Sequence, residues 1–295
     1  MKVGSTSTSH VRWPGVAIFS LPLIVLAATP NSWPRWVFMW LLSIAVYFAC
    51  KVLTWSAVDT SGVPAWRQWA YLFTWPGMDA RRFFDQSSPS PPSASEWLAA
   101  LFKMLLGGII FWGAQLVVPT GSPILLGWAG MTGTAFVLHF GLFHLLSCFW
   151  RGLGVDAPPL MNAPPRSTSV AEFWGQRWNT AFRDLTQRFL FRPLARRLGL
   201  VRALAVSFLF SGAVHDVVIS LPAGGGYGGP TAFFIIQAVA ILVEKSPVGR
   251  RLGLGRGLGG WLFTAIALLV PARLLFHERF IAAIVIPFMQ ALGAA

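Results

Sequence analysis

Two short stretches of this sequence carry side chains whose types and spacing could do chemistry. Residues 172–179 read EFWGQRWN and gather two tryptophans, an arginine and an asparagine into eight positions. Residues 208–222 read FLFSGAVHDVVISLP and place His215 beside Asp216 in an otherwise apolar run. Ionisable groups are costly inside hydrocarbon, so they are functional candidates wherever a span contains them.

His215 could act as a general base near neutral pH, because the ordinary pKa of histidine lies close to that range. The competing interpretation is a structural histidine bonded to a neighbouring helix. Successive side chains on a helix point about 100° apart, so His215 and Asp216 are each expected to have a separate partner. His139 and His144 lie five positions apart and face different directions, so we expect structural roles for them and no metal site.

The composition indicates an integral, multi-pass membrane protein. Hydrophobic residues make up 55% of the chain and charged residues only 11%, against about 25% in a soluble domain. The mean hydropathy is +0.61. The net charge of +13 fits membrane orientation and anionic lipid headgroups better than nucleic acid, which we do not expect as a partner.

The apolar stretches predict an all-α integral membrane fold, a polytopic bundle of about eight transmembrane helices in a single domain, 1–295. The expected spans are 14–28, 36–53, 98–118, 123–149, 200–221, 231–244, 258–275 and 279–293. The last two meet at 276–278, where a re-entrant hairpin is an alternative. Cys50 and Cys148 are expected to be small buried hydrophobes.

Basic residues gather in the connections after the second, fourth and sixth expected spans. By the positive-inside rule these connections and both termini are expected to be cytoplasmic. The Pro- and Ser-rich stretch 87–95 is predicted to be an extended linker on that side. The run GGGYGG, 224–229, is predicted to be a flexible turn on the other side.

The cytoplasmic segment 166–202 carries eight arginines against two acidic residues. Phe182, Leu185 and Phe189 recur at helical spacing, which predicts an amphipathic or re-entrant helix at the membrane surface. An interface anchor would explain the arginines. It would not explain Gly175 or Asn179.

EFWGQRWN closely resembles the FWGxRWN signature of plant-type wax synthases, within the membrane-bound O-acyltransferase superfamily. In that family an arginine-rich segment follows, and then an embedded histidine in an SGxxHE context. Here SGAVHD occupies 211–216, and His215 follows Asn179 by 36 residues. The resemblance implies an enzyme that transfers a fatty acyl group from acyl-coenzyme A, as a substrate, to a hydroxyl, without a bound cofactor.

By the same resemblance His215 is the catalytic histidine and Asn179 acts with it. Trp174, Arg177 and Trp178 match the aromatic and basic frame of the signature. The departure is Asp216, which stands where the family has glutamate, so any contact that the longer acid makes is in doubt.

Arg183 and Arg188 are expected to bind the phosphates of coenzyme A, because that head group is cytosolic and strongly anionic. The tryptophans would then seat the segment at the membrane interface.

The acceptor is expected to be a long-chain or lipid alcohol, with membrane lipids as surroundings, while the oligomeric state cannot be read. Residue usage suggests a bacterial inner membrane. Two alternatives remain open: a proton-coupled transporter with His215 and Asp216 as relay groups, and an inactive scaffold.

Overall fold

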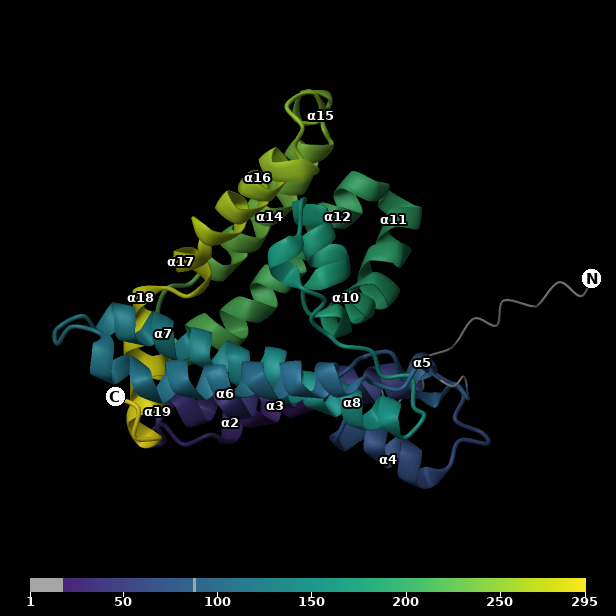
Figure 1. Cartoon of the computed structure of the whole chain (residues 1–295), viewed down its shortest axis with the longest axis horizontal. Helices are drawn as coiled ribbons and strands as arrows, with labels where there is room; N and C mark the ends of the chain where they lie inside the picture. Colours follow the sequence, from purple (N-terminus) through teal and green to yellow (C-terminus); the bar gives the residue numbers. More distant parts are fainter. Residues whose placement is uncertain (1–17, 87–88) are drawn as a thin grey trace, which may run out of the picture.

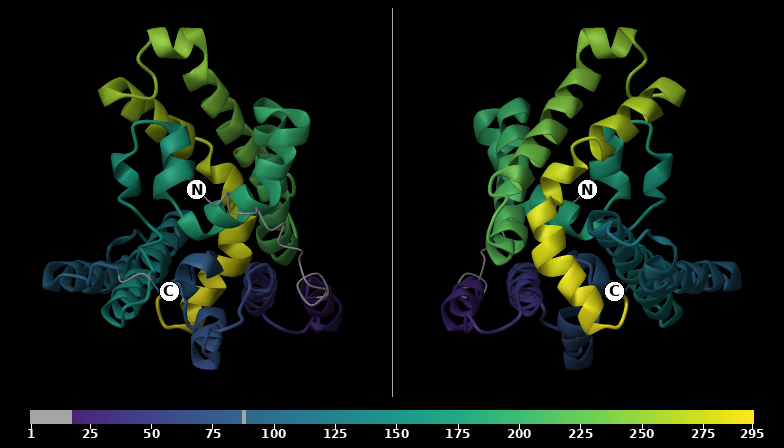
Figure 2. Two further views of the ribbon diagram at one scale, coloured as in Figure 1. Left: turned by 90° about the vertical axis from the view of Figure 1, so that its right-hand side faces the viewer. Right: turned by 90° about the vertical axis from the view of Figure 1, so that its left-hand side faces the viewer.

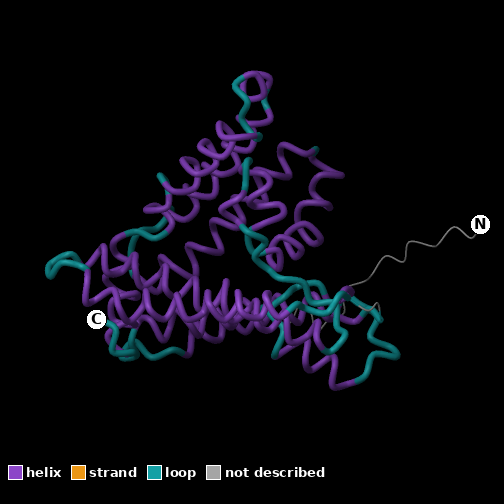
Figure 3. Tube along the Cα trace, in the orientation of Figure 1, coloured by secondary structure: helices purple, strands orange, loops and turns teal. Residues whose placement is uncertain are grey.

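The computed structural model describes residues 18–86 and 89–295, and every regular element in this part is a helix (Figure 3). Among these residues, five helices are long and apolar enough to cross a membrane, which supports the expected all-α, multi-pass membrane class. They are Arg35–Ser56, Ala94–Val117, Pro123–Gly152, Leu200–Ala223 and Gly257–Leu275. Residues 14–17 of the first expected span and 87–88 of the expected linker lie outside the described residues.

The helices of the first half run alongside one another across the lower part of Figure 1. In chain order they are α2 (Ser20–Ala28), α3 (Arg35–Ser56), α4 (Ala65–Phe73), α5 (Ala80–Phe84), α6 (Ala94–Val117), α7 (Pro123–Ala135), the π-helix η1 (Phe136–Leu142) and α8 (Phe143–Gly152). α6 packs along α7 and η1 and also contacts α8. Since α7, η1 and α8 follow each other without a break, they form one rod over the expected span 123–149.

The second half forms an inclined group above the first (Figures 1 and 2). Its short elements before the next long helix are η2 (Pro164–Arg166), α9 (Val170–Glu172), η3 (Phe173–Arg177), α10 (Thr180–Thr186), η4 (Gln187–Phe191) and α11 (Arg192–Leu198). Then follow α12 (Leu200–His215), η5 (Asp216–Ser220), α13 (Leu221–Ala223), α14 (Gly229–Lys245), α15 (Pro247–Arg251), α16 (Gly257–Leu269) and α17 (Ala272–Leu275). α12 packs along α14, and α14 contacts α16 and α17.

The expected span 279–293 is divided into α18 (Glu278–Phe280), η6 (Ile281–Val285) and α19 (Ile286–Ala291), which pass across one end of α6 and α7 (Figure 1). The Trp112 indole near the end of α6 donates to the Leu292 carbonyl at 2.9 Å. The end of the chain therefore lies near the C-terminal end of α6. The cytoplasmic placement of both termini stays a prediction. The segment is largely buried, since Ile281, Ile284 and Met289 are almost wholly enclosed, and a span at 279–293 stays a prediction.

At the linker side, the loop between α4 and α5 is fixed by a buried lysine. Lys51 on α3 is fully buried, donates to the Gly77 carbonyl at 2.6 Å and lies 3.2 Å from the centroid of the Tyr71 ring. The Tyr71 hydroxyl in turn lies 2.6 Å from the Thr54 hydroxyl. A buried ammonium group needs such partners. The loop residues that Lys51 holds border the cavity described below.

α6 and α7 approach each other closely through glycines. A Cβ atom added at Gly107 would meet the backbone nitrogen of Val137 at 2.5 Å and the Gly133 carbonyl oxygen at 2.8 Å. Small residues at helix crossings allow this kind of approach in membrane proteins. By contrast, a Cβ at Gly113 of the same helix would have nothing within 4 Å.

We therefore expect Gly107→Ala to lower the free energy of unfolding by about 1–3 kcal/mol, because the added methyl forces two backbones apart. Gly113→Ala is the matched control and should be neutral or slightly stabilising, since alanine is the better helix former. Thermal unfolding of both variants in detergent measures the difference. Equal melting temperatures would contradict the close crossing.

Candidate active site

His215 is the last residue of α12, just before the π-helical turn η5. Its Nδ1 lies 2.7 Å from the carbonyl oxygen of Ser211, one turn earlier. A carbonyl only accepts, so this contact keeps the proton on Nδ1 and leaves the Nε2 lone pair for another partner. The imidazole also lies 4.5 Å from the ring of Phe234 on α14. A histidine held in this way can receive a proton at Nε2, which a general base requires.

Asp216 has partners of its own, as the sequence predicted. One carboxylate oxygen accepts from the Ser220 hydroxyl at 2.9 Å and the Gly228 N–H at 2.8 Å. The other accepts from the N–H and hydroxyl of Thr231, at 3.1 and 2.5 Å. Gly228 and Thr231 form the start of α14, so the carboxylate caps the positive end of that helix.

The signature segment is anchored at its start by a distant carboxylate. Glu244, at the end of α14 and 4% exposed, accepts from the backbone N–H groups of Val170 at 2.8 Å and Ala171 at 3.0 Å. The first N–H groups of a helix have no partner within the helix, so an acid from elsewhere can satisfy them. Glu244 thereby fixes α9 against α14.

Arg177 links two parts of the chain through its hydrogen bonds. Its guanidinium donates to Glu172 at 2.7 Å and to the Asn162 carbonyl at 3.2 Å, while its own carbonyl accepts from the Asn162 N–H at 2.8 Å. Partial burial raises the pKa of Glu172, but hydrogen bonds from Thr168 and Arg177 outweigh it and hold that pKa below its ordinary value. Arg177 therefore shapes the turn around it.

Trp174 reaches the middle of α12 and α14. Its indole N–H lies 3.4 Å from the Gln237 side-chain oxygen, and its ring packs against Phe208 and Phe234 at 6.1 and 5.5 Å. Phe234 is the same ring that His215 contacts. The structure thus brings one predicted signature residue next to the predicted catalytic histidine, through a shared phenylalanine.

Trp178 faces the other half of the molecule. Its ring stacks on Phe173 at 5.5 Å with an interplanar angle of 13°, and on His139 of η1 at 6.2 Å with an angle of 21°. Phe173 in turn contacts Trp174 at 5.1 Å. A row of aromatic rings therefore leads from η1 through the signature segment to His215.

Asn179 adopts a left-handed backbone conformation, with φ at 42°. Asparagine tolerates this conformation better than most residues with a Cβ. Thr180 N–H donates to the Leu160 carbonyl at 3.0 Å, which holds the turn. The Asn179 side chain makes no capping bond to α10, and within the described part of the chain no hydrogen bond joins it to His215.

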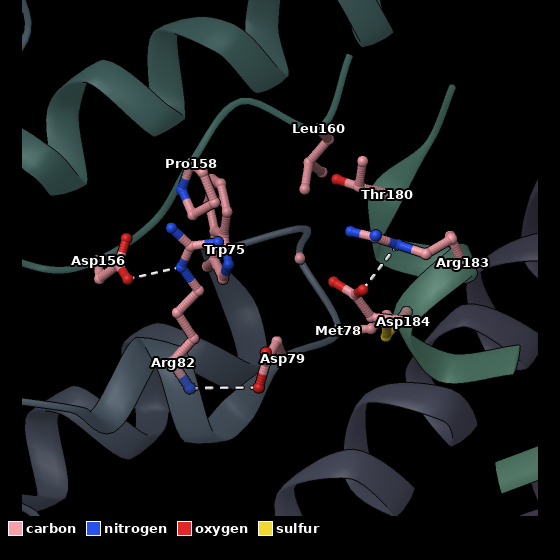
Figure 4. A pocket seen from close by; sticks show the side chains of 11 residues that line it. Trp75, Met78, Asp79, Arg82, Asp156, Pro158, Leu160, Thr180, Arg183 and Asp184 are labelled. Atoms are coloured by element: carbon pink, nitrogen blue, oxygen red, sulfur yellow. Dashed lines mark hydrogen bonds and ion pairs between the residues drawn. The ribbon is translucent and has the colours of Figure 1, made fainter. Parts of the chain in front are cut away.

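A small polar cavity of about 30 Å³ follows Asn179 (Figure 4). Arg183 borders it and forms an ion pair with Asp184 at 2.8 Å, while Arg82 pairs with Asp156 at 2.5 Å. Burial raises the pKa of Asp184, an effect that Arg183 opposes. The cavity has room for about two water molecules, and both of these arginines are already paired with acids.

Arg188 lies away from this cavity and donates to the Ala57 carbonyl at 2.7 Å. The side chains of both predicted donor-binding arginines are thus engaged inside the protein. Five other arginines of the segment 166–202 are exposed. Arg166 precedes the signature, and the rest follow on α11 and the start of α12: Arg192, Arg196, Arg197 and Arg202.

A second polar cluster bridges α6 and α8. Donor atoms of Glu96, His144 and Cys148 lie within 4.8 Å of one another, a spacing that could suit a metal ion. However, Lys103 lies 3.0 Å from His144 Nδ1, and Arg151 pairs with Glu96. These cations already supply the positive charge that a metal would bring, so the cluster is best described as an ion-pair network.

Residues 157–236, which contain the signature segment and His215, match the model of the membrane bound O-acyl transferase family. The resemblance to wax synthase-like members of this superfamily is thus confirmed. The chain is similar to three plant proteins in particular. One is the long-chain-alcohol O-fatty-acyltransferase of Simmondsia chinensis, 30% identical over 135 residues, which are 38% of this chain and 38% of that protein.

The other two are from Arabidopsis thaliana. Probable long-chain-alcohol O-fatty-acyltransferase 3 is 32% identical over 34% of this chain and 33% of its own length. Probable long-chain-alcohol O-fatty-acyltransferase 7 is 29% identical over 44% of this chain and 42% of its own length. The similarity therefore spans well under half of each relative.

Sequence reasoning missed Glu244, Gln237, Phe234 and Arg82. Glu244 had a signal, because acidic residues are scarce in this chain and this one ends an apolar run. Gln237 had a weaker one, as an uncharged polar residue within an apolar stretch. Phe234 had none, since a phenylalanine in a span is ordinary.

We expect Asp216→Ala to lower the free energy of unfolding by about 2–4 kcal/mol, because four hydrogen-bond donors and the start of α14 lose their acceptor. Glu278→Ala, which removes an exposed acid near the same end of the fold, should change stability by less than about 0.5 kcal/mol. Thermal unfolding in detergent measures both. A stable Asp216→Ala protein that has lost activity would instead assign Asp216 to the chemistry.

Proposed function

We propose that this chain is an acyltransferase of the wax ester synthase type, which moves a fatty acyl group from acyl-coenzyme A to the hydroxyl of a long-chain or lipid alcohol. The observation that carries the proposal is the state of His215, in the region that matches the family. Its Nδ1 is held by the Ser211 carbonyl, so Nε2 is the basic atom. The relatives' names, long-chain-alcohol O-fatty-acyltransferase, supply the substrate class.

In the proposed step, His215 Nε2 takes the proton from the alcohol as the alcohol oxygen attacks the thioester carbonyl. The carbon–sulfur bond breaks when the tetrahedral intermediate collapses. The proton on Nε2 then passes to the departing thiolate. The products are an ester and free coenzyme A, and His215 returns to its starting state.

Asn179 is proposed to bind the thioester carbonyl through its side-chain amide, where charge develops on the oxygen. Its side chain is not used to cap α10, so it is free for this role. Trp174 and Trp178 would form apolar walls for the substrates. Arg177 would act indirectly by keeping the turn in shape, and Asp216 by fixing the start of α14 behind His215.

Asp216 also bears on the transporter alternative. A relay group must exchange protons with its surroundings, but this carboxylate accepts four hydrogen bonds from one helix start and one neighbouring hydroxyl. Such a network favours a structural acid that holds the start of α14 in place. This favours the enzyme over the transporter.

For the donor's head group we propose the exposed arginines of α11 and α12, with Arg183 and Arg188 shaping the segment that carries them. Exposed guanidinium groups can bind phosphate without first leaving an internal partner. We also propose that the arginine-rich side is cytoplasmic and that the whole chain, 1–295, forms a single domain. The signature segment would enter the membrane as a re-entrant turn, and α14 would add a further span. Residue usage alone suggests a bacterial inner membrane, whereas the relatives are plant proteins.

His215→Ala should reduce ester formation by about 10² to 10⁴, because a positioned base contributes that much to the rate. The measurement is coenzyme A release by purified protein with palmitoyl-coenzyme A and a panel of alcohols. The control is the melting temperature, which should stay close to that of the wild type. An active, folded His215→Ala protein would refute the mechanism, and a wild-type protein inactive with every alcohol would refute the function.

Replacing both Arg196 and Arg197 by glutamine should raise the KM for palmitoyl-coenzyme A about tenfold and weaken its dependence on salt, while the KM for the alcohol stays unchanged. Arg250 and Arg251 provide a matched control, because they are also exposed and carry the same charge at the end of the short helix α15, outside the signature segment. If both double variants behave alike, the effect is general electrostatics and α11 is not the head-group site.

A further inference from the structure

His139 lies within the candidate span Pro123–Gly152, in the π-helical segment η1. The sequence favoured a structural histidine here. Its ring stacks on Trp178 of the signature segment and meets Phe143 edge-on at 5.3 Å. This histidine therefore lies beside the proposed site, although it is far from the signature in sequence.

The hydrogen-bonding capacity of His139 is unmet. Its Nδ1 is buried and has no hydrogen-bond partner among the residues that the structure describes. A structural histidine in an apolar environment normally satisfies its ring nitrogens, because a buried polar atom without a partner costs free energy. His215 illustrates the satisfied case through its bond to Ser211.

Other buried polar atoms share this condition, but their surroundings differ. The indole nitrogens of Trp40 and Trp150 belong to rings packed against phenylalanines outside the site. The Arg183 Nε is compensated by the ion pair with Asp184. Among the unpartnered atoms of the described residues, which also include the Ser207 hydroxyl on α12, only the His139 nitrogen belongs to a ring stacked on a signature tryptophan.

The local backbone is a second, independent observation. η1 is π-helical, and short π-helical segments occur frequently at functional sites, because they redirect side chains within a helix. Two other such segments carry the proposed site: η3 contains Trp174, and η5 begins immediately after His215. His139 thus belongs to the row of aromatic rings that leads to His215, and like the other residues of the site it lies in or next to a π-helical segment.

We propose that His139 binds the acyl donor, through a hydrogen bond between Nδ1 and an amide of the donor's pantetheine arm. This inference rests on the proposed function. A long-chain alcohol has one polar group, and that group must react at His215, so it leaves nothing for His139. The pantetheine arm carries amides that can donate and accept, and it must pass between the exposed arginines and the thioester. Trp178, which stacks on His139, directly precedes Asn179, the residue proposed to bind the thioester.

The test compares His139→Phe, which keeps an aromatic ring for stacking, with His139→Asn, which restores a polar atom near the position of Nδ1. His139→Phe should raise the KM for palmitoyl-coenzyme A about tenfold, with kcat and the KM for the alcohol within about threefold of wild type. In His139→Asn the KM for palmitoyl-coenzyme A should return most of the way to the wild-type value. Melting temperatures should be similar throughout.

Direct binding separates this inference from the proposed function. The non-reactive thioether hexadecyl-coenzyme A, titrated calorimetrically into each protein, should show a Kd raised about tenfold in His139→Phe and largely restored in His139→Asn. An unchanged Kd, or equal losses in both variants, would overturn the role of His139. If wild type binds the thioether but esterifies no alcohol, the proposed function fails while the binding comparison still stands. If wild type does not bind it, both fail.

Discussion

The placement of the signature segment depends on the buried carboxylate of Glu244. Where water is absent, every backbone N–H needs a protein partner, and a short helix that starts inside the fold cannot supply its own. Glu244 gives two such partners to Val170 and Ala171. This contact fixes the start of α9 against α14. Trp174, one turn after Val170, then lies within hydrogen-bonding distance of Gln237, and its ring packs on Phe234, which His215 also contacts.

The polar groups of this apolar interior are of two kinds: some are fully hydrogen-bonded, and others keep an atom free for a partner. Asp216, Glu172 and Arg177 are saturated with hydrogen bonds and hold the backbone in place. His215 uses one ring nitrogen for the same purpose and keeps the other for chemistry. The Nδ1 atom of His139 has no hydrogen-bond partner within the described part of the chain. A group that is fully bonded stabilises a fold, whereas one with spare capacity is available to a substrate.

The sequence was sufficient for the helical membrane class, because composition alone requires it. It also separated the partners of His215 and Asp216, since helical geometry dictates their divergence. It could not predict that Glu244 would cap a helix more than seventy residues earlier, because such a contact depends on how α9 and α14 meet in space. The same limit applies to the last helical segment, because its apolar composition could not show that Ile281 and Met289 are buried against other helices of the bundle.

The length of α14 bears on how the protein sits in a bilayer. At 17 residues it is about 26 Å long, shorter than the roughly 30 Å of a typical hydrocarbon core, and it is inclined in Figure 1. If α14 spans the bilayer as proposed, the bilayer would adapt to this hydrophobic mismatch by thinning beside the short helix. The thinned lipid would lie next to the helix that carries Phe234 and the cap formed by Asp216. A water-insoluble ester formed at His215 would then have a short lateral route into the bilayer.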